Sequence, residues 1–172
     1  MLTEKLQKTI CYYKDFPKAG INFVDLMPVL NNPNLFKDLI DKMSKNSCFS
    51  NADAIVAIDA RGFIFGSAIA YLLSKPLITA RKPGKLPGIL TSKSYDLEYG
   101  SNEISIQKEL LENYERFAIV DDILATGGTV KCVEDILFIH KKIVTGISVV
   151  IELGDLNGSS ICHSKVFSEI SL

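Results

Sequence analysis

The chain has 172 residues, enough for one domain with a substantial buried core. Its 19 Lys and Arg residues balance 20 Asp and Glu residues, so the formal charge of −1 excludes a general basic surface for nucleic acid or an anionic membrane. No apolar run has the length of a membrane span and the amino terminus has no signal-peptide core, so we expect a cytoplasmic protein without nucleic-acid or membrane partners.

The cysteines are widely spaced and form no C-x-x-C pair. With only two histidines in the chain, this spacing argues against a zinc site or a disulfide framework. We therefore expect four reduced thiols, with Cys132 on a core-facing or intermediate position of a helix.

The first part of the chain is predicted to be helical with one break. Residues 1–12 show the apolar spacing of an amphipathic helix, and residues 15–20 form a turn-rich segment. Pro33 then opens a second helix that runs to about Met43. Its apolar face holds Leu35, Leu39, Ile40 and Met43.

The rest of the chain alternates short apolar runs with helical patterns. The predicted elements are a strand at 54–58, a helix at 62–73, strands at 77–80 and 117–120, a helix at 129–140 and a strand at 143–153. Continuous apolar runs of this length are typical of buried parallel strands. The sequence therefore predicts an α/β fold, a parallel twisted sheet with helices on both faces.

Residues 81–102 interrupt this alternation. The segment contains two prolines and three glycines, which excludes a long helix, and loops of this length in compact domains usually serve a function. We expect a flexible lid. Residues 103–107 then alternate polar and apolar side chains, as a half-exposed strand does, and this strand could return the lid to the sheet.

The most informative motif follows the strand at 117–120. Asp121 and Asp122 come at its carboxyl end, where open α/β sheets bind ligands, and the small residues at 125–129 then lead into a helix. A phosphate fits the amino terminus of such a helix, while the two carboxylates suit ribose hydroxyls and a divalent cation. The alternative is an ordinary strand-turn-helix connection. The Gly-Lys-Ser/Thr of a Walker loop and the G-x-G-x-x-G of a dinucleotide site are both absent here.

A cation stands at the end of an earlier strand. Arg61 follows the strand at 54–58 and precedes Gly62, which lets backbone approach closely. Its planar guanidinium matches phosphate oxygens, but an equally good interpretation is a structural pair with Asp59. Lys82, at the end of the strand at 77–80, is a second candidate for anion binding.

These motifs together resemble a known family. Residues 117–130 resemble the phosphoribosyl pyrophosphate (PRPP) motif of the type I phosphoribosyltransferases. The segments 59–63, 81–88, 94–100 and 121–129 occur in the order and spacing of the adenine phosphoribosyltransferases, and residues 15–25 and 150–153 are also similar. The resemblance covers nearly the whole chain. It implies a single domain (1–172), with a small hood and base pocket at about 1–35 and a mobile catalytic lid at about 82–102.

The resemblance also implies roles for individual residues. The 5-phosphate of PRPP is expected on Ala125, Thr126, Gly127, Gly128 and Thr129, its ribose hydroxyls on Asp121 and Asp122, and its diphosphate on Ala60, Arg61 and Lys82. Magnesium is expected to arrive with PRPP, without a dedicated protein site, reaching Asp121 and Asp122 only through PRPP or water. A cis peptide is expected between Asp59 and Ala60.

The base and the catalytic group are expected elsewhere. By resemblance, Phe23 stacks on the purine, Leu153 packs on its other side, and the backbone of Asn22 and Val24 reads its edge; Val24 stands where relatives commonly have Arg. Glu98 is the implied proton-transfer residue of the lid, which also carries Lys85, Tyr95 and Tyr99.

The resulting prediction is a magnesium-dependent purine-salvage enzyme, a homodimer by resemblance, that converts adenine and PRPP to AMP and diphosphate. Two alternatives stay open: the same reaction on xanthine, hypoxanthine or guanine, and a non-catalytic regulator that binds PRPP or a purine.

Overall fold

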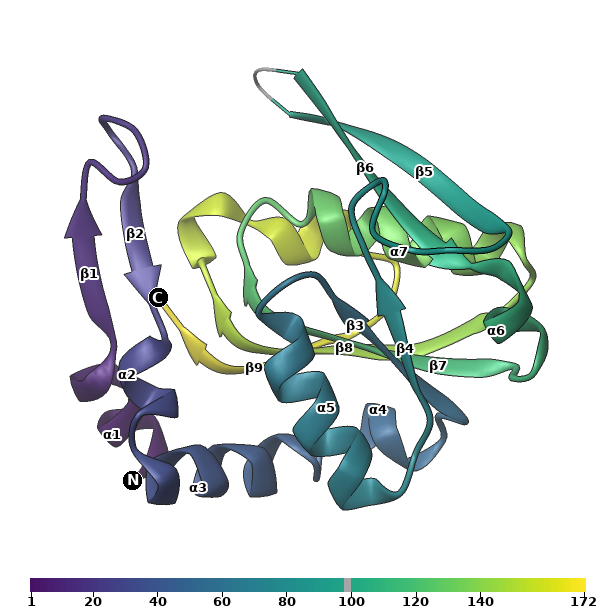
Figure 1. The fold of residues 1–172 in the computed structure, drawn as a ribbon. Coiled ribbons are helices and arrows are strands. Elements are labelled where there is room, and N and C mark those ends of the chain that lie inside the picture. The colour runs from purple at the N-terminus through teal and green to yellow at the C-terminus, as the bar shows by residue number, and fades with distance from the viewer. Residues whose placement is uncertain (98–99) are drawn as a thin grey trace. The chain divides into compact units, whose positions relative to one another are not determined.

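The computed structural model, drawn in Figure 1, describes residues 1–97 and 100–172. The chain divides into two compact units, Met1–Lys42 and Met43–Leu172. No helix in these residues is both long enough and apolar enough to pass through a bilayer.

The first unit begins with a helix and a hairpin. Helix α1 (Leu2–Thr9) precedes β1 (Cys11–Lys14), which pairs antiparallel with β2 (Asn22–Asp25). The helix predicted over 1–12 therefore ends three residues early, because Tyr12 and Tyr13 pair with Val24 and Phe23 in a ribbon that favours aromatic residues. The turn-rich break is confirmed, and its Phe16-Pro17 bond is cis.

The second predicted helix is confirmed as α3 (Pro33–Met43), after the short α2 (Met27–Leu30). Asn32 Oδ1 accepts a hydrogen bond from the Leu35 N–H at 3.1 Å and so satisfies a free donor of the first turn. The predicted apolar face is buried at Leu35, Leu39, Ile40 and Met43.

The second unit is built on a five-stranded parallel sheet in the order β4-β3-β7-β8-β9. Its strands are β3 (Ala54–Ile58), β4 (Leu77–Ala80), β7 (Arg116–Leu124), β8 (Ile143–Glu152) and β9 (Val166–Ser171). The main helices are α5 (Gly62–Leu73) and α7 (Gly128–Ile139). The predicted α/β fold is confirmed, and β3, α5 and β4 have the predicted limits.

Helices cover both faces of this sheet. A Cβ on Gly66 of α5 would contact Ala57, whereas the neighbouring Val56 belongs to the core cluster that includes Val133 and Ile136 of α7. Since successive side chains of a strand point to opposite faces, α5 and α7 lie on opposite sides, as Figure 1 shows. Small and branched side chains allow this close packing.

Strand β7 is longer than predicted. It continues through Asp121 and Asp122 to Leu124, because this stretch pairs with β8 at Asp121 with Val149 and at Ile123 with Ile151. The two acids therefore lie inside the last part of the strand, which fixes their backbone.

The segment predicted as a lid contains a hairpin. Strands β5 (Leu90–Leu97) and β6 (Gly100–Gln107) pair antiparallel as a separate two-stranded sheet. The strand predicted at 103–107 thus pairs with β5, and it meets the end of β4 through one bridge between Arg81 and Ser105. Ser105 is buried rather than exposed, and its hydroxyl is satisfied by a hydrogen bond with that of Ser92 at 2.7 Å.

Several short elements complete the unit. They are α4 (Ser47–Ser50), α6 (Lys108–Glu112) and the 3-10 helices η1 (Gly154–Leu156) and η2 (Gly158–Ile161). The four cysteines are free thiols and Cys132 is buried, as predicted.

Candidate active site

The sheet order places one pair of strand ends where a ligand site is expected. Strand β3 is the first strand of this sheet along the chain, yet it lies between β4 and β7. The connections that leave β3 and β7 therefore run to opposite sides. Open α/β sheets bind ligands at the carboxyl ends of such strands. The candidate site is therefore the edge formed by the ends of β3, β4 and β7.

A cavity of about 350 Å³ opens at this edge. Its lining includes six residues predicted from the sequence: Ala60, Arg61, Lys82, Asp121, Asp122 and Thr129. The sequence reasoning did not assign Ile58, Asp59, Asn102 or Ile104 to the site. Asn102 comes from β6, opposite Tyr95 in the register, so its place depends on a hairpin that the sequence did not reveal. The cavity thus combines cations and carboxylates from three strands and the hairpin.

Two acids that line the cavity form ion pairs with arginines. Arg61 Nε lies 2.5 Å from Asp122 Oδ2, and Arg81 Nε lies 3.0 Å from Asp59 Oδ2. Asp59, which the sequence offered as a structural partner of Arg61, is thus paired with Arg81, and Arg61 is paired with Asp122. Arg61 comes from the start of α5 and Asp122 from β7, so this ion pair links two neighbouring strand ends. The Asp59-Ala60 peptide is cis, as expected from the resemblance.

The environment of Asp121 perturbs its carboxyl strongly. Burial raises the pKa of its carboxyl well above the usual range, and the charge of Asp122 raises it further. Asp121 Oδ1 accepts the Asp122 N–H at 2.8 Å, and a Cβ on Gly62 would approach the same oxygen to 2.8 Å. A carboxylate held in this way favours a nearby cation, which would restore its charged form.

A second, smaller hollow of about 80 Å³ adjoins the first. It is lined by Asp121 and by residues 123–130, so it contains all five residues predicted to bind the 5-phosphate. Gly127 adopts a φ of +82°, which few other residues tolerate, and α7 begins at the next residue. The first N–H groups of a helix have no intrahelical acceptor, and its dipole favours negative charge there. The hollow therefore fits a phosphate bound mainly by backbone.

The side-chain donors of the site indicate how the protein could bind Mg²⁺. Among residues 1–97 and 100–172, no three His, Cys, Asp or Glu side chains are grouped to hold a metal ion. Asp121 and Asp122 supply hard oxygen donors at one point of the cavity, which is the chemistry that Mg²⁺ prefers. The pair fits a cation that keeps water or substrate oxygens in its remaining positions.

Only some of the residues predicted for the lid belong to the described part of the chain. Lys85 is exposed, and its carbonyl accepts a 3.4 Å hydrogen bond from Arg81. Tyr95 belongs to β5, whereas Glu98 and Tyr99 lie outside the described residues.

The predicted base-binding residues fall in both units. Asn22, Phe23 and Val24 form β2 of the first unit, where Val24 is buried and Phe23 makes an edge contact with Phe16 at 5.3 Å between ring centroids. Leu153 follows β8 in the second unit, and its N–H donates to Leu124 O at 2.9 Å.

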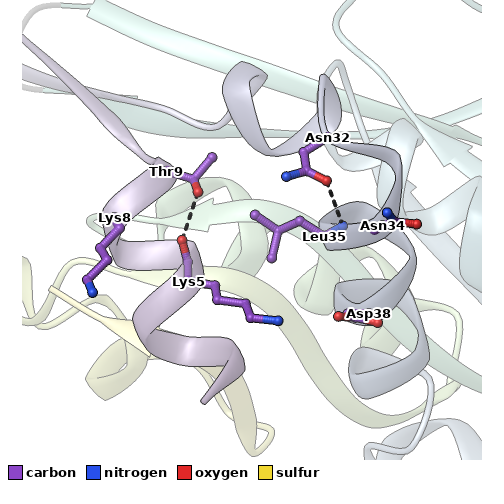
Figure 2. A pocket seen from close by; sticks show the side chains of 7 residues that line it. All are labelled: Lys5, Lys8, Thr9, Asn32, Asn34, Leu35 and Asp38. Carbon is purple, nitrogen blue, oxygen red and sulfur yellow. Dashed lines mark hydrogen bonds between the residues drawn. The ribbon is translucent and has the colours of Figure 1, made fainter.

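Another hollow, of about 400 Å³, lies in the first unit and is shown in Figure 2. Its lining consists of Lys5, Lys8, Thr9, Asn32, Asn34, Leu35 and Asp38. Two of its polar side chains are engaged within the helices: Thr9 donates to Lys5 O at 2.8 Å, and Asn32 caps α3. It contains none of the residues predicted for the site.

Comparison with known proteins agrees with the geometry. The family model of the phosphoribosyl transferase domain matches residues 28–153. The chain is 55% identical over 170 residues to the adenine phosphoribosyltransferase of Prochlorococcus marinus (strain MIT 9211), with 99% of each protein covered. This chain belongs to the adenine phosphoribosyltransferases of the type I phosphoribosyltransferase family.

Solved adenine phosphoribosyltransferases share the fold. That of Thermoanaerobacter pseudethanolicus is 38% identical, with all of both chains covered and a TM-score of 0.92. That of Saccharomyces cerevisiae, crystallised with an iminoaltritol bisphosphate and adenine, is 34% identical, with 98% of each chain covered and a TM-score of 0.89.

Proposed function

We propose that this adenine phosphoribosyltransferase makes AMP and diphosphate from adenine and PRPP through the cavity at the ends of β3, β4 and β7. The observation that carries this proposal is the adjacency of two unlike anion sites, one formed by a helix amino terminus and one by Arg61 and Lys82, with two buried carboxylates between them. A sugar that carries a phosphate at one end and a diphosphate at the other fits this arrangement.

Each part of PRPP has a proposed partner. The backbone of residues 125–129 binds the 5-phosphate, and Asp121 and Asp122 accept hydrogen bonds from the ribose hydroxyls. Arg61 and Lys82 neutralise the diphosphate, with the Ala60 backbone beside them. Mg²⁺ bound with PRPP would add charge stabilisation to the leaving diphosphate and would reach Asp121 or Asp122 directly or through water.

The reaction breaks the bond between the anomeric carbon and the diphosphate oxygen, and a purine nitrogen forms a new bond to that carbon. Positive charge develops on the sugar, so the protein must orient the base, exclude water and stabilise the departing diphosphate. We assign proton transfer at the purine to Glu98, and water exclusion to the lid with Lys85, Tyr95 and Tyr99.

The base site is proposed from separate segments. Phe23 supplies an aromatic face, the backbone of Asn22 and Val24 supplies hydrogen bonds, and Leu153 supplies an apolar surface. Val24 is buried, so its side chain serves packing and leaves recognition to the backbone. A cytoplasmic homodimer is the assembly that we propose.

The test is a diphosphate-release assay with PRPP, Mg²⁺ and, in turn, adenine, guanine, hypoxanthine and xanthine. We expect turnover with adenine to exceed that with each other base. Faster turnover with another purine would establish the first alternative. PRPP binding without turnover on any base would establish the regulator.

A further inference from the structure

A short segment of the chain lies directly behind the phosphate loop. Gly158, the first residue of η2, is buried, and a Cβ placed on it would collide with Ala125 O and lie 2.8 Å from Gly127 N. From the other side, a Cβ on Gly127 would collide with Gly158 O and lie 3.0 Å from Ile161 Cγ1. The two backbones are thus in direct contact. We call residues 157–161 the rear wall.

The requirement for glycine at 158 comes from space and not from conformation. Gly127 has a positive φ, but Gly158 does not, and the left-handed turn of the rear wall is made by Asn157 with a φ of +49°. An alanine at 158 therefore suits the local backbone. The three atoms nearest to its methyl group would all belong to the phosphate loop, each within 3 Å.

The residues on either side of the rear wall are bonded to the elements on either side of the phosphate loop. Glu134 of α7 is fully buried, and its carboxylate accepts hydrogen bonds from His163 N at 3.0 Å and Ser164 N at 2.9 Å. Just before the rear wall, Leu153 N donates to Leu124 O at 2.9 Å. These bonds join the residues that flank the rear wall to α7, which follows the phosphate loop, and to β7, which precedes it. Because the rear wall is anchored in this way, pressure from an added side chain should displace the loop.

We propose that Gly158 is a positioning residue for PRPP. Because Gly158 has no side chain, the backbone of residues 125–128 can lie where its N–H groups reach the 5-phosphate. This inference rests on the proposed function, since it needs a phosphate in the loop. Gly158 does not touch substrate and acts through Gly127. Backbone donors act on a phosphate only over a short range of distances, so a small displacement of the loop weakens binding strongly.

The experiment compares Gly158→Ala with the parent enzyme. We expect the Kd of ribose 5-phosphate and the KM of PRPP to rise roughly 10- to 100-fold, the effect typical of a misplacement of about 1 Å. The Kd of diphosphate and the KM of adenine should change much less, since their groups lie outside the loop. A general loss of stability would lower the fraction of active enzyme, and it would affect the binding of ribose 5-phosphate and of diphosphate equally.

Gly146→Ala is the control for a general loss of stability, because an alanine there is strained by crowding and also by the φ of +150°. A Cβ there would lie 2.8 Å from Cys48 Cβ and 3.0 Å from Phe167, near the amino end of β8 and away from the site. It should lower the melting temperature and leave the Kd of ribose 5-phosphate at the parent value. An equal loss of ribose 5-phosphate binding in both variants would overturn the proposal.

Ile161→Ala is a second test variant, to be used if Gly158→Ala does not fold. Ile161 is 42% exposed, so its truncation should preserve the fold but remove support from beneath Gly127. We expect weaker ribose 5-phosphate binding with unchanged diphosphate binding; binding equal to that of the parent would overturn the proposal. If the parent itself fails to bind ribose 5-phosphate, the proposed function fails and not the role of Gly158 alone.

Discussion

The two anion sites of the sheet edge differ in what builds them. The small hollow at residues 123–130 has Asp121 as its only charged lining residue among those described, and its walls are backbone and small side chains. The larger cavity is lined by Asp59, Arg61, Lys82, Asp121 and Asp122. Ligand binding at the first site should therefore be most sensitive to added bulk, and ligand binding at the second site to lost charge. We call them the space-limited site and the charge-limited site. The same substrate should then respond differently to steric changes and to charge changes at its two ends.

The largest predicted effect belongs to neither anion site. If Glu98 transfers a proton at the purine, Glu98→Gln should lower kcat by roughly 10²–10⁴, as is typical for a positioned acid or base. The KM of PRPP should change little, because both anion sites are intact. Leu97→Ala is the neighbouring control and should have a far smaller effect in single-turnover measurements. Parent-like turnover in Glu98→Gln would leave the lid only the task of excluding water.

At the space-limited site, Gly127→Val should weaken PRPP binding by about 10²-fold. The side chain is disfavoured at a φ of +82°, and it would collide with Gly158 O. Diphosphate binding should persist, because Arg61 and Lys82 are untouched. Calorimetric titration with ribose 5-phosphate and with diphosphate checks the split. Equal losses for both ligands would show that the two sites are not separate.

At the charge-limited site, Arg61→Gln should raise the KM of PRPP by roughly tenfold, which corresponds to about 1.4 kcal/mol. The side chain keeps hydrogen-bonding ability but loses its charge, so the dependence of PRPP binding on salt should become shallower. Lys108→Gln removes a charge from an exposed residue of α6 and serves as the control. An unchanged salt dependence in Arg61→Gln would argue that Arg61 serves only its ion pair with Asp122.

The contrast also explains which parts of the molecule the sequence revealed. The apolar run of β3 is fully buried and that of β4 is buried at alternate residues, so local composition was enough to place both strands and to bring Arg61 and Lys82 to one edge. The position of the phosphate loop followed from its acids, small residues and helix. Such features are local, and each has a direct physical cause in the residues that form it.

Features that depend on distant partners were missed or wrong. Strand β1 is exposed at every residue, and its pairing with β2 is what makes it a strand. Asn102 reaches the cavity through a hairpin whose strands are largely polar, so no apolar alternation identified β5. Gly158 lies about thirty residues after the loop that it contacts, and it has an ordinary φ, so its sequence context gives no turn signal. The ion pair of Arg61 with Asp122 likewise joins two strand ends that only the sheet order brings together.

The smallest predicted effect concerns Asp121, which both sites share. Because burial and then Asp122 raise its pKa in the folded chain, the folded state holds more protons than the unfolded state between the ordinary Asp value and the raised one. The free energy of unfolding should therefore fall as pH rises through this window. Asp121→Asn removes the titration but keeps an oxygen that accepts the Asp122 N–H. The variant should be slightly more stable than the parent at neutral pH and nearly equal to it in acid.

Urea unfolding at several pH values tests this sign. The stability difference between Asp121→Asn and the parent should grow as pH rises from acid to neutral; a constant difference would contradict the raised pKa. PRPP with Mg²⁺ should bind the parent more tightly as pH rises through the same window, because the cation favours the ionised carboxyl, and this part of the pH dependence should be lost in the variant. The apoenzyme would then gain stability by the same change that weakens substrate binding, which is expected where a buried charge is retained for function.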